Sequence, residues 1–218
     1  MRVLAVAHRA GNDLEALRAA TAAGVDVVEA DVHHYRDRLD VRHSKALRPL
    51  PLLWDAGEPL TSTRVPVLQL AALLGALSPD VGLMLDLKGP GAVGRHAARI
   101  VLELLPDRPV LVCSRWWPGV AAFAGLPRAR PLLTARNRAE MHRLRRRVRG
   151  PYAPYGVSLH RSLLAPAVVA ELREHVELVL TWGVDDERVL QDVLARGVTG
   201  VISSSPDVLA QVRGCTVP

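Results

Sequence analysis

The chain has 218 residues, of which 49% are apolar and 23% are charged, and its net charge is +6. This composition excludes a disordered or fibrous protein, and no apolar run approaches the roughly 20 residues that a membrane span needs. Two cysteines are too few for a disulfide framework, and the N-terminal MRVLAVAHRAG lacks the pattern of a signal peptide. We therefore expect a cytoplasmic protein. Much of the positive charge lies in MHRLRRRVRG at 141–150, which we interpret as a solvated helix face, and no nucleic-acid partner is expected.

Short β-branched apolar runs alternate along the chain with longer segments of helical period. The predicted strands cover 2–8, 25–32, 81–88, 109–114, 129–134, 155–160, 176–182 and 198–203. Helices are predicted within 13–24, 92–105, 138–148, 165–175, 185–197 and 205–213, so that nearly every strand is followed by a helix. After the second strand an insert (33–80) interrupts this alternation, with a short strand at 38–44 and a helix at 67–77.

Eight βα units in one chain predict an α/β fold, a single (β/α)8 TIM barrel in one domain (1–218) with a small insert after strand 2. An open doubly wound sheet is the structural alternative. In a barrel of this kind the functional groups lie at the carboxyl ends of the strands. That rule directs attention to the polar residues that follow each apolar run.

Acidic residues lie at the ends of two predicted strands. Glu29 and Asp31 are two positions apart and therefore point the same way, and the same holds for Asp86 and Lys88. Carboxylates at the mouth of a barrel are costly without counter-charge. One divalent cation held by Glu29, Asp31 and Asp86 would supply it, and oxygen ligands favour Mg²⁺ or Ca²⁺, with Mn²⁺ as a third candidate.

Two histidines occupy comparable positions. His8 ends the first predicted strand, and His43 ends the short strand of the insert. Imidazoles that flank a cation are typical of acid/base chemistry at phosphorus. Lys88 is one of only two lysines in the chain, which favours a specific role beside a phosphate or carboxylate oxygen. His160 also ends a strand, and we consider it a substrate contact.

Several motifs, in order, resemble those of the glycerophosphodiester phosphodiesterase family. The resemblance begins at His8-Arg9-Ala10-Gly11 and spans almost the whole chain. The further matching segments are VEADV (28–32), RDRLDVRHS (36–44), VPVLQLAALL (65–74), MLDLKG (84–89), TWGVDD (181–186) and GVTGVISSSPDVL (197–209). The family is a (β/α)8 barrel. The resemblance therefore implies a metal-dependent enzyme that hydrolyses small glycerophosphodiesters to an alcohol and glycerol phosphate.

The resemblance also assigns roles to individual residues. It implies that Glu29, Asp31 and Asp86 are metal ligands, the last in place of the family's usual glutamate. His8 and His43 match the family's acid/base histidines, with the order of acid and base left open.

The remaining matches concern the substrate. Arg9 and Lys88 match cations beside the phosphate, and Trp182 matches an aromatic residue near the substrate.

Two departures stand out, because Ala10 replaces a glycine and Ser44 replaces the aspartate that follows the second histidine. They motivate one alternative, a barrel that binds a phosphorylated ligand without turnover. A second alternative is a nucleotide-dependent oxidoreductase, since residues 89–94 fit the pattern GxGxxG.

Overall fold

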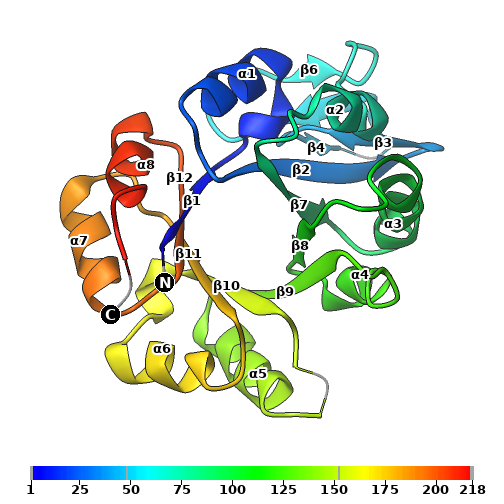
Figure 1. Cartoon of the computed structure of the whole chain (residues 1–218). Helices are drawn as coiled ribbons and strands as arrows, with labels where there is room; N and C mark the ends of the chain where they lie inside the picture. The colour runs from blue at the N-terminus through cyan, green and yellow to red at the C-terminus, as the bar shows by residue number, and fades with distance from the viewer. Residues whose placement is uncertain (1, 48, 152, 217–218) are drawn as a thin grey trace.

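The computed structural model describes residues 2–47, 49–151 and 153–216. Within these residues, eight parallel strands form a closed barrel, because β1 pairs with β12 on one side and with β2 on the other (Figure 1). The barrel strands are β1 (Leu4–Ala7), β2 (Val27–Tyr35), β7 (Gly82–Lys88), β8 (Val110–Ser114), β9 (Ala129–Ala135), β10 (Gly156–His160), β11 (Leu178–Trp182) and β12 (Gly200–Ser203). The predicted TIM barrel is confirmed, and the open doubly wound alternative is wrong.

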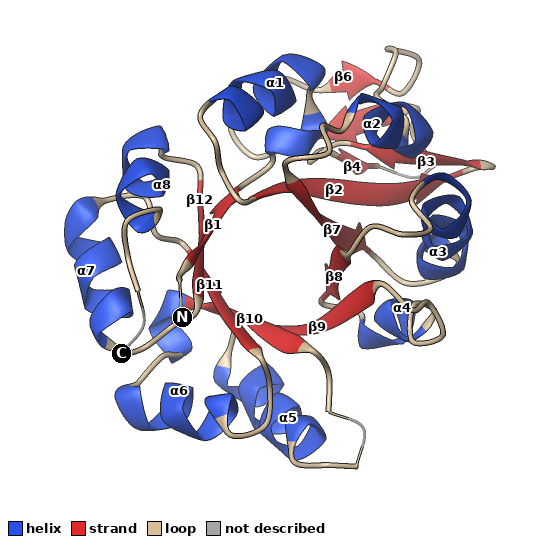
Figure 2. Cartoon of the chain, viewed as in Figure 1, coloured by secondary structure: helices blue, strands red, loops and turns tan. Residues whose placement is uncertain are grey.

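Each barrel strand is followed by a helix, and the helices form the outer ring (Figure 2). They are α1 (Leu14–Ala22), α2 (Leu70–Ala76), α3 (Val93–Leu104), α4 (Trp117–Ala121), α5 (Arg138–Val148), α6 (Pro166–Arg173), α7 (Glu187–Ala195) and α8 (Pro206–Val212), with short 3₁₀ turns η1 (Ala10–Asn12) and η2 (Arg161–Leu163). No helix among the described residues is both long and apolar enough to cross a membrane.

Two apolar layers follow from the alternation of side chains along the strands. The larger layer lies between strands and helices and includes Val28, Ala30 and Val32 of β2. The smaller layer fills the barrel and includes Val27 of β2 and Met84 of β7. Residues that share the parity of these last two side chains therefore point into the barrel, above its apolar floor.

The insert after β2 differs from its prediction in detail. β2 extends to Tyr35 and forms a hairpin with β3 (Arg38–Val41), so the predicted strand at 38–44 ends before His43. The predicted helix at 67–77 is α2 and is shorter at both ends. The structure adds a small antiparallel sheet of β4 (Lys45–Ala46), β5 (Leu52–Trp54) and β6 (Thr61–Ser62). This sheet and its loops lie beside the barrel mouth at the end of β2.

Candidate active site

The three predicted metal ligands converge because of strand register. β2 and β7 are paired so that Asp31 lies directly opposite Asp86, and Glu29 lies opposite Met84. All three carboxylates share the inward parity of the apolar barrel floor. One oxygen from each of Glu29, Asp31 and Asp86 lies within 4.8 Å of the other two. Their predicted convergence is confirmed.

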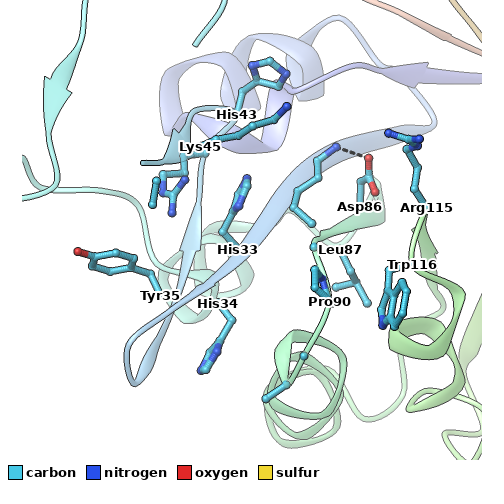
Figure 3. A pocket seen from close by; sticks show the side chains of 16 residues that line it. His33, His34, Tyr35, His43, Lys45, Asp86, Leu87, Pro90, Arg115 and Trp116 are labelled. Atoms are coloured by element: carbon cyan, nitrogen blue, oxygen red, sulfur yellow. Dashed lines mark hydrogen bonds and ion pairs between the residues drawn. The ribbon is translucent and has the colours of Figure 1, made fainter. Parts of the chain in front are cut away.

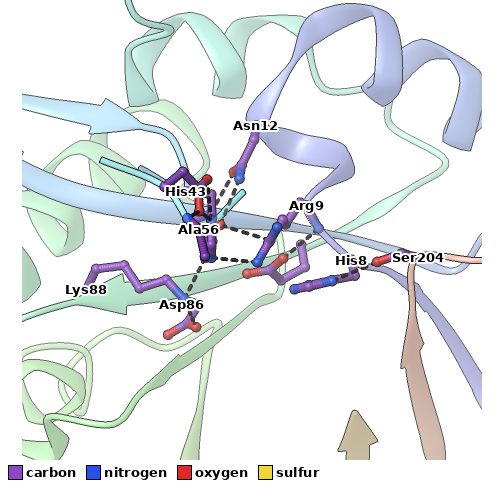
Figure 4. A network of polar contacts seen from close by, with 11 residues as sticks. His8, Arg9, Asn12, His43, Ala56, Asp86, Lys88 and Ser204 are labelled. Atoms are coloured by element: carbon purple, nitrogen blue, oxygen red, sulfur yellow. Dashed lines mark hydrogen bonds and ion pairs between the residues drawn. The ribbon is translucent and has the colours of Figure 1, made fainter. Parts of the chain in front are cut away.

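Lys88 joins this group from the end of β7 (Figure 4). Its ammonium lies 2.5 Å from Oδ1 of Asp31 and also donates a hydrogen bond to Asp86. The two carboxylates raise the pKa of Lys88 in spite of burial, which acts to lower it. The ammonium is therefore charged and compensates part of the negative charge of the cluster.

The segment after β1 holds the other faces of the carboxylates (Figure 4). The backbone N–H of Arg9 donates to Glu29 over 2.7 Å, and the Asn12 amide donates to Oδ2 of Asp31 over 2.8 Å. Asn12 also accepts from the backbone N–H of Asp31 over 2.8 Å. This requires η1 to lie against β2, and Gly11 permits it, since a Cβ there would lie 2.8 Å from Cβ of Ala30. The close packing of η1 against β2 thus requires a glycine at position 11.

The cluster carries more negative charge than its neighbours neutralise. Burial, followed by the charges of Asp31 and Asp86, raises the pKa of Glu29 from 4.5 to about 8. Burial also raises the pKa of Asp86 despite its contact with Lys88. Lys88 and Asn12 outweigh burial at Asp31, whose pKa is lowered. An oxygen-only donor set with uncompensated charge fits a hard divalent cation, which would favour the ionised form of all three carboxylates.

His43 lies just beyond β3 and contacts two charged residues. Its Nδ1 is 2.6 and 2.7 Å from the two carboxylate oxygens of Asp55, and its Nε2 is 2.5 Å from Nη2 of Arg9. A guanidinium can only donate, so Nε2 is the acceptor and the ring proton is on Nδ1, facing Asp55. The pKa of Asp55 is lowered because the hydrogen bond from His43 outweighs burial.

No pattern in the sequence singles out Asp55, which lies in the loop after β5. The contact with Asp55 explains how His43 is held although Ser44 replaces the expected aspartate.

His8 lies just after β1, and its Nδ1 is 2.9 Å from the hydroxyl of Ser204. Ser204 is itself held by Asp185, whose carboxylate accepts from the Ser204 backbone N–H over 2.8 Å. Burial, followed by the charge of Arg9, lowers the pKa of His8 to about 4. The ring is therefore neutral at pH 7 in the free protein. Ser204 thus takes part in the site through its contact with His8.

A cavity of about 410 Å³ opens above these groups at the barrel mouth, and we call it the mouth cavity. Most of the predicted site residues line it, namely His8, Arg9, Glu29, His43, Asp86, Lys88 and Trp182. Asp31 lies beneath them, 1% exposed. His160 does not line this cavity; its ring meets that of Trp182 edge to face at 4.6 Å, and its Nδ1 is 2.7 Å from the Ser162 hydroxyl.

Comparison with known proteins gives a consistent result. No protein-family model and no curated protein matches the sequence. Solved structures that resemble it over nearly its full length include glycerophosphodiester phosphodiesterases. A phosphodiesterase of Oleispira antarctica, in complex with the product sn-glycerol-3-phosphate, has a TM-score of 0.74 and 19% identity, with 97% of each chain covered.

Two further structures agree. A putative enzyme of this class from Silicibacter pomeroyi has a TM-score of 0.79 and 17% identity, covering 97% of this chain and 93% of its own. That of Thermotoga maritima has a TM-score of 0.74 and 21% identity, with 98% and 100% covered. At such identities the likeness establishes the shared barrel, and the chemistry has to be argued from this chain's own residues.

Proposed function

We propose that this protein hydrolyses glycerophosphodiesters to an alcohol and glycerol phosphate, with the aid of a divalent cation. The observation that carries the proposal is the convergence of three carboxylates, Lys88 and two histidines at one cavity of the barrel mouth. A binding barrel without turnover would need counter-charge for a phosphate. It would not need an imidazole aligned by a carboxylate, as His43 is by Asp55.

Glu29, Asp31 and Asp86 are the residues that would hold the cation. When bound there, a divalent cation would polarise the phosphate and stabilise the charge that develops on its oxygens. Lys88 and Arg9 contribute cationic groups beside the same position and favour the binding of the phosphate. Asn12 and the Arg9 backbone N–H keep the carboxylates oriented while the substrate is absent.

The two histidines perform the proton transfers in this proposal. Phosphate oxygens compete with His43 for the Arg9 guanidinium, and this exposes the Nε2 lone pair that takes the proton from the attacking hydroxyl. A phosphate beside His8 raises its pKa toward the ordinary value, so His8 can hold a proton. The bond between phosphorus and the leaving alcohol breaks as the 2-hydroxyl of the substrate glycerol forms the new P–O bond, and the alcohol oxygen takes the proton from His8. Water then opens the resulting cyclic phosphate with the two proton transfers reversed, which gives glycerol phosphate and restores both histidines.

A panel of glycerophosphodiesters tests this function. The wild-type chain with added Mg²⁺, Mn²⁺ or Ca²⁺ should release glycerol phosphate from at least one of them, while an Asp31→Asn, Asp86→Asn double variant should not. The double variant also controls for a contaminating hydrolase. Tight binding of the diesters without release of product in any of the three metals would instead favour the non-catalytic barrel.

A further inference from the structure

A second and larger cavity, of about 750 Å³, adjoins the mouth cavity, and we call it the outer cavity. One wall comes from the end of β2 and from the insert, with His33, His43 and Lys45 (Figure 3). The opposite wall comes from the loop between β7 and α3 and from Trp116 after β8. It lies outside the barrel mouth, and His8 lines only the mouth cavity.

The two cavities meet at the proposed reaction centre. Four residues line both of them, namely His43, Asp86, Lys88 and Arg115. A phosphodiester carries two alcohols on one phosphorus, so a phosphorus held at this junction would direct one alcohol into each cavity. The mouth cavity is the smaller and has hydroxyl-bearing Ser158 and Ser204 in its lining, which suits the glycerol. The outer cavity is left for the alcohol that departs.

The charge of the outer cavity is mainly positive. Its lining contains four cationic side chains (Arg42, Lys45, Lys88 and Arg115) and one carboxylate, Asp86, which Lys88 already contacts. Arg42 is paired with Asp40 and Arg115 with Glu140. Lys45 is exposed and lies 5.8 Å from the ring of Trp54, and no carboxylate of the described residues forms an ion pair with it. Lys45 is therefore the cation most able to bind a ligand.

The glycine-rich loop 89–92 adds to this character. Gly89 and Gly91 have positive φ values of 81° and 100°, and a Cβ at either would meet nothing within 4 Å. The loop leads into α3, whose first residues have no side-chain cap. Backbone N–H groups at a helix start favour anions. The GxGxxG pattern thus forms part of the wall of this cavity.

The aromatic residues that line the outer cavity among the described residues do not form a site for a quaternary ammonium group. Such a cation is held by several aromatic faces. In the outer cavity Tyr35 has the guanidinium groups of Arg36 and Arg38 at 5.4 and 5.5 Å from its ring centre, so positive charge already lies there. Trp116 offers one further ring beside Arg115.

We propose, on the basis of the proposed function, that the outer cavity receives the leaving alcohol and selects alcohols that carry a negative charge. The substrate class is then a glycerophosphodiester whose second alcohol bears a phosphate or carboxylate group, rather than choline or ethanolamine.

Three ligands of graded charge test this proposal: glycerophosphoglycerol, the same diester with a terminal phosphate on one glycerol, and glycerophosphocholine. Calorimetry with added Mg²⁺ measures kcat/KM for a ligand that is cleaved and Kd for a ligand that is not. Selectivity is the ratio of the same quantity between two ligands. The wild-type chain should prefer the terminal phosphate, and the preference should fall as salt is added. Lys45→Ala should lower it about two- to five-fold, the contribution of an exposed ion pair.

Two variants serve as controls. Lys45→Arg keeps the charge and should keep the preference, and Arg146→Glu on α5 changes the net charge as much as Lys45→Glu but lies away from both cavities. Lys45→Glu should lower the preference further than Lys45→Ala.

The proposal would be overturned by equal kcat/KM or Kd for all three ligands, by a preference for glycerophosphocholine, or by no measurable binding of the phosphate-bearing diester. It would also be overturned if Arg146→Glu lowered the preference as much as Lys45→Glu. Binding that follows charge without cleavage would support the cavity and refute the hydrolysis.

Discussion

Replacing Asp55 with asparagine tests whether His43 depends on a carboxylate supplied by the insert. The change keeps the shape of the side chain but removes the charge that accepts the Nδ1 proton. Hydrogen bonds to a charged group contribute about 1.5–3 kcal/mol. The side chains of His43 and Asp55 are 32% and 22% exposed, so the lower half of that range applies. At about 1.4 kcal/mol per tenfold change in rate, kcat should fall about 10- to 40-fold.

The assay is a double-mutant cycle on the best diester of the panel. If Asp55 acts through His43, Asp55→Asn should have less than about a two-fold effect once His43→Ala is present. Glu58→Gln, in the same loop and exposed, is the matched control and should leave kcat unchanged. An Asp55→Asn protein with normal kcat, or the same loss with and without His43, would refute this reasoning.

The remaining predictions concern the histidines and Glu29. His8→Ala and His43→Ala should each lower kcat about 10²- to 10⁴-fold while changing the free energy of unfolding by about 1 kcal/mol or less. His142→Ala on α5 is the control and should change neither quantity. Near-normal kcat in both variants would contradict the roles of His8 and His43. In metal-free protein the pKa of Glu29 is about 8 against an ordinary 4.5, so the folded state binds more protons than the unfolded state between these values. The free energy of unfolding should therefore fall as pH rises from 4.5 to 8, by at most about 1.4 kcal/mol per pH unit from this group. Denaturant unfolding at several pH values measures the slope, and Glu29→Gln should flatten it; an unchanged slope in that variant would refute the assignment.

The features that the sequence predicted are those governed by regular periods. Alternation along β2 and β7 placed Glu29, Asp31 and Asp86 on one face, and the rule for parallel strands placed that face at the barrel mouth. In the structure the register of these two paired strands sets Asp31 opposite Asp86. Long helices such as α3 and α5 were found for the same reason, because their apolar positions recur with helical spacing.

The features that were missed have no such period. α4 spans only Trp117–Ala121 and contains Pro118 and Gly119, so its five residues give no helical pattern. β4 and β6 have two residues each and exist only through their pairing with β5. Asp55 reaches His43 through this small sheet, and no local signal in the sequence could place that loop against the barrel. Contacts made by irregular segments thus depend on the tertiary fold.

The measurement that tests the central claim most directly is turnover as a function of free metal. Protein stripped of metal in excess chelator should release no glycerol phosphate from a diester that the untreated protein cleaves. Titration with Mg²⁺, Mn²⁺ or Ca²⁺ should restore the rate in the wild-type chain and fail to do so in Asp31→Asn. Undiminished release in chelator, or full restoration in Asp31→Asn, would contradict a metal-dependent phosphodiesterase centred on Glu29, Asp31 and Asp86.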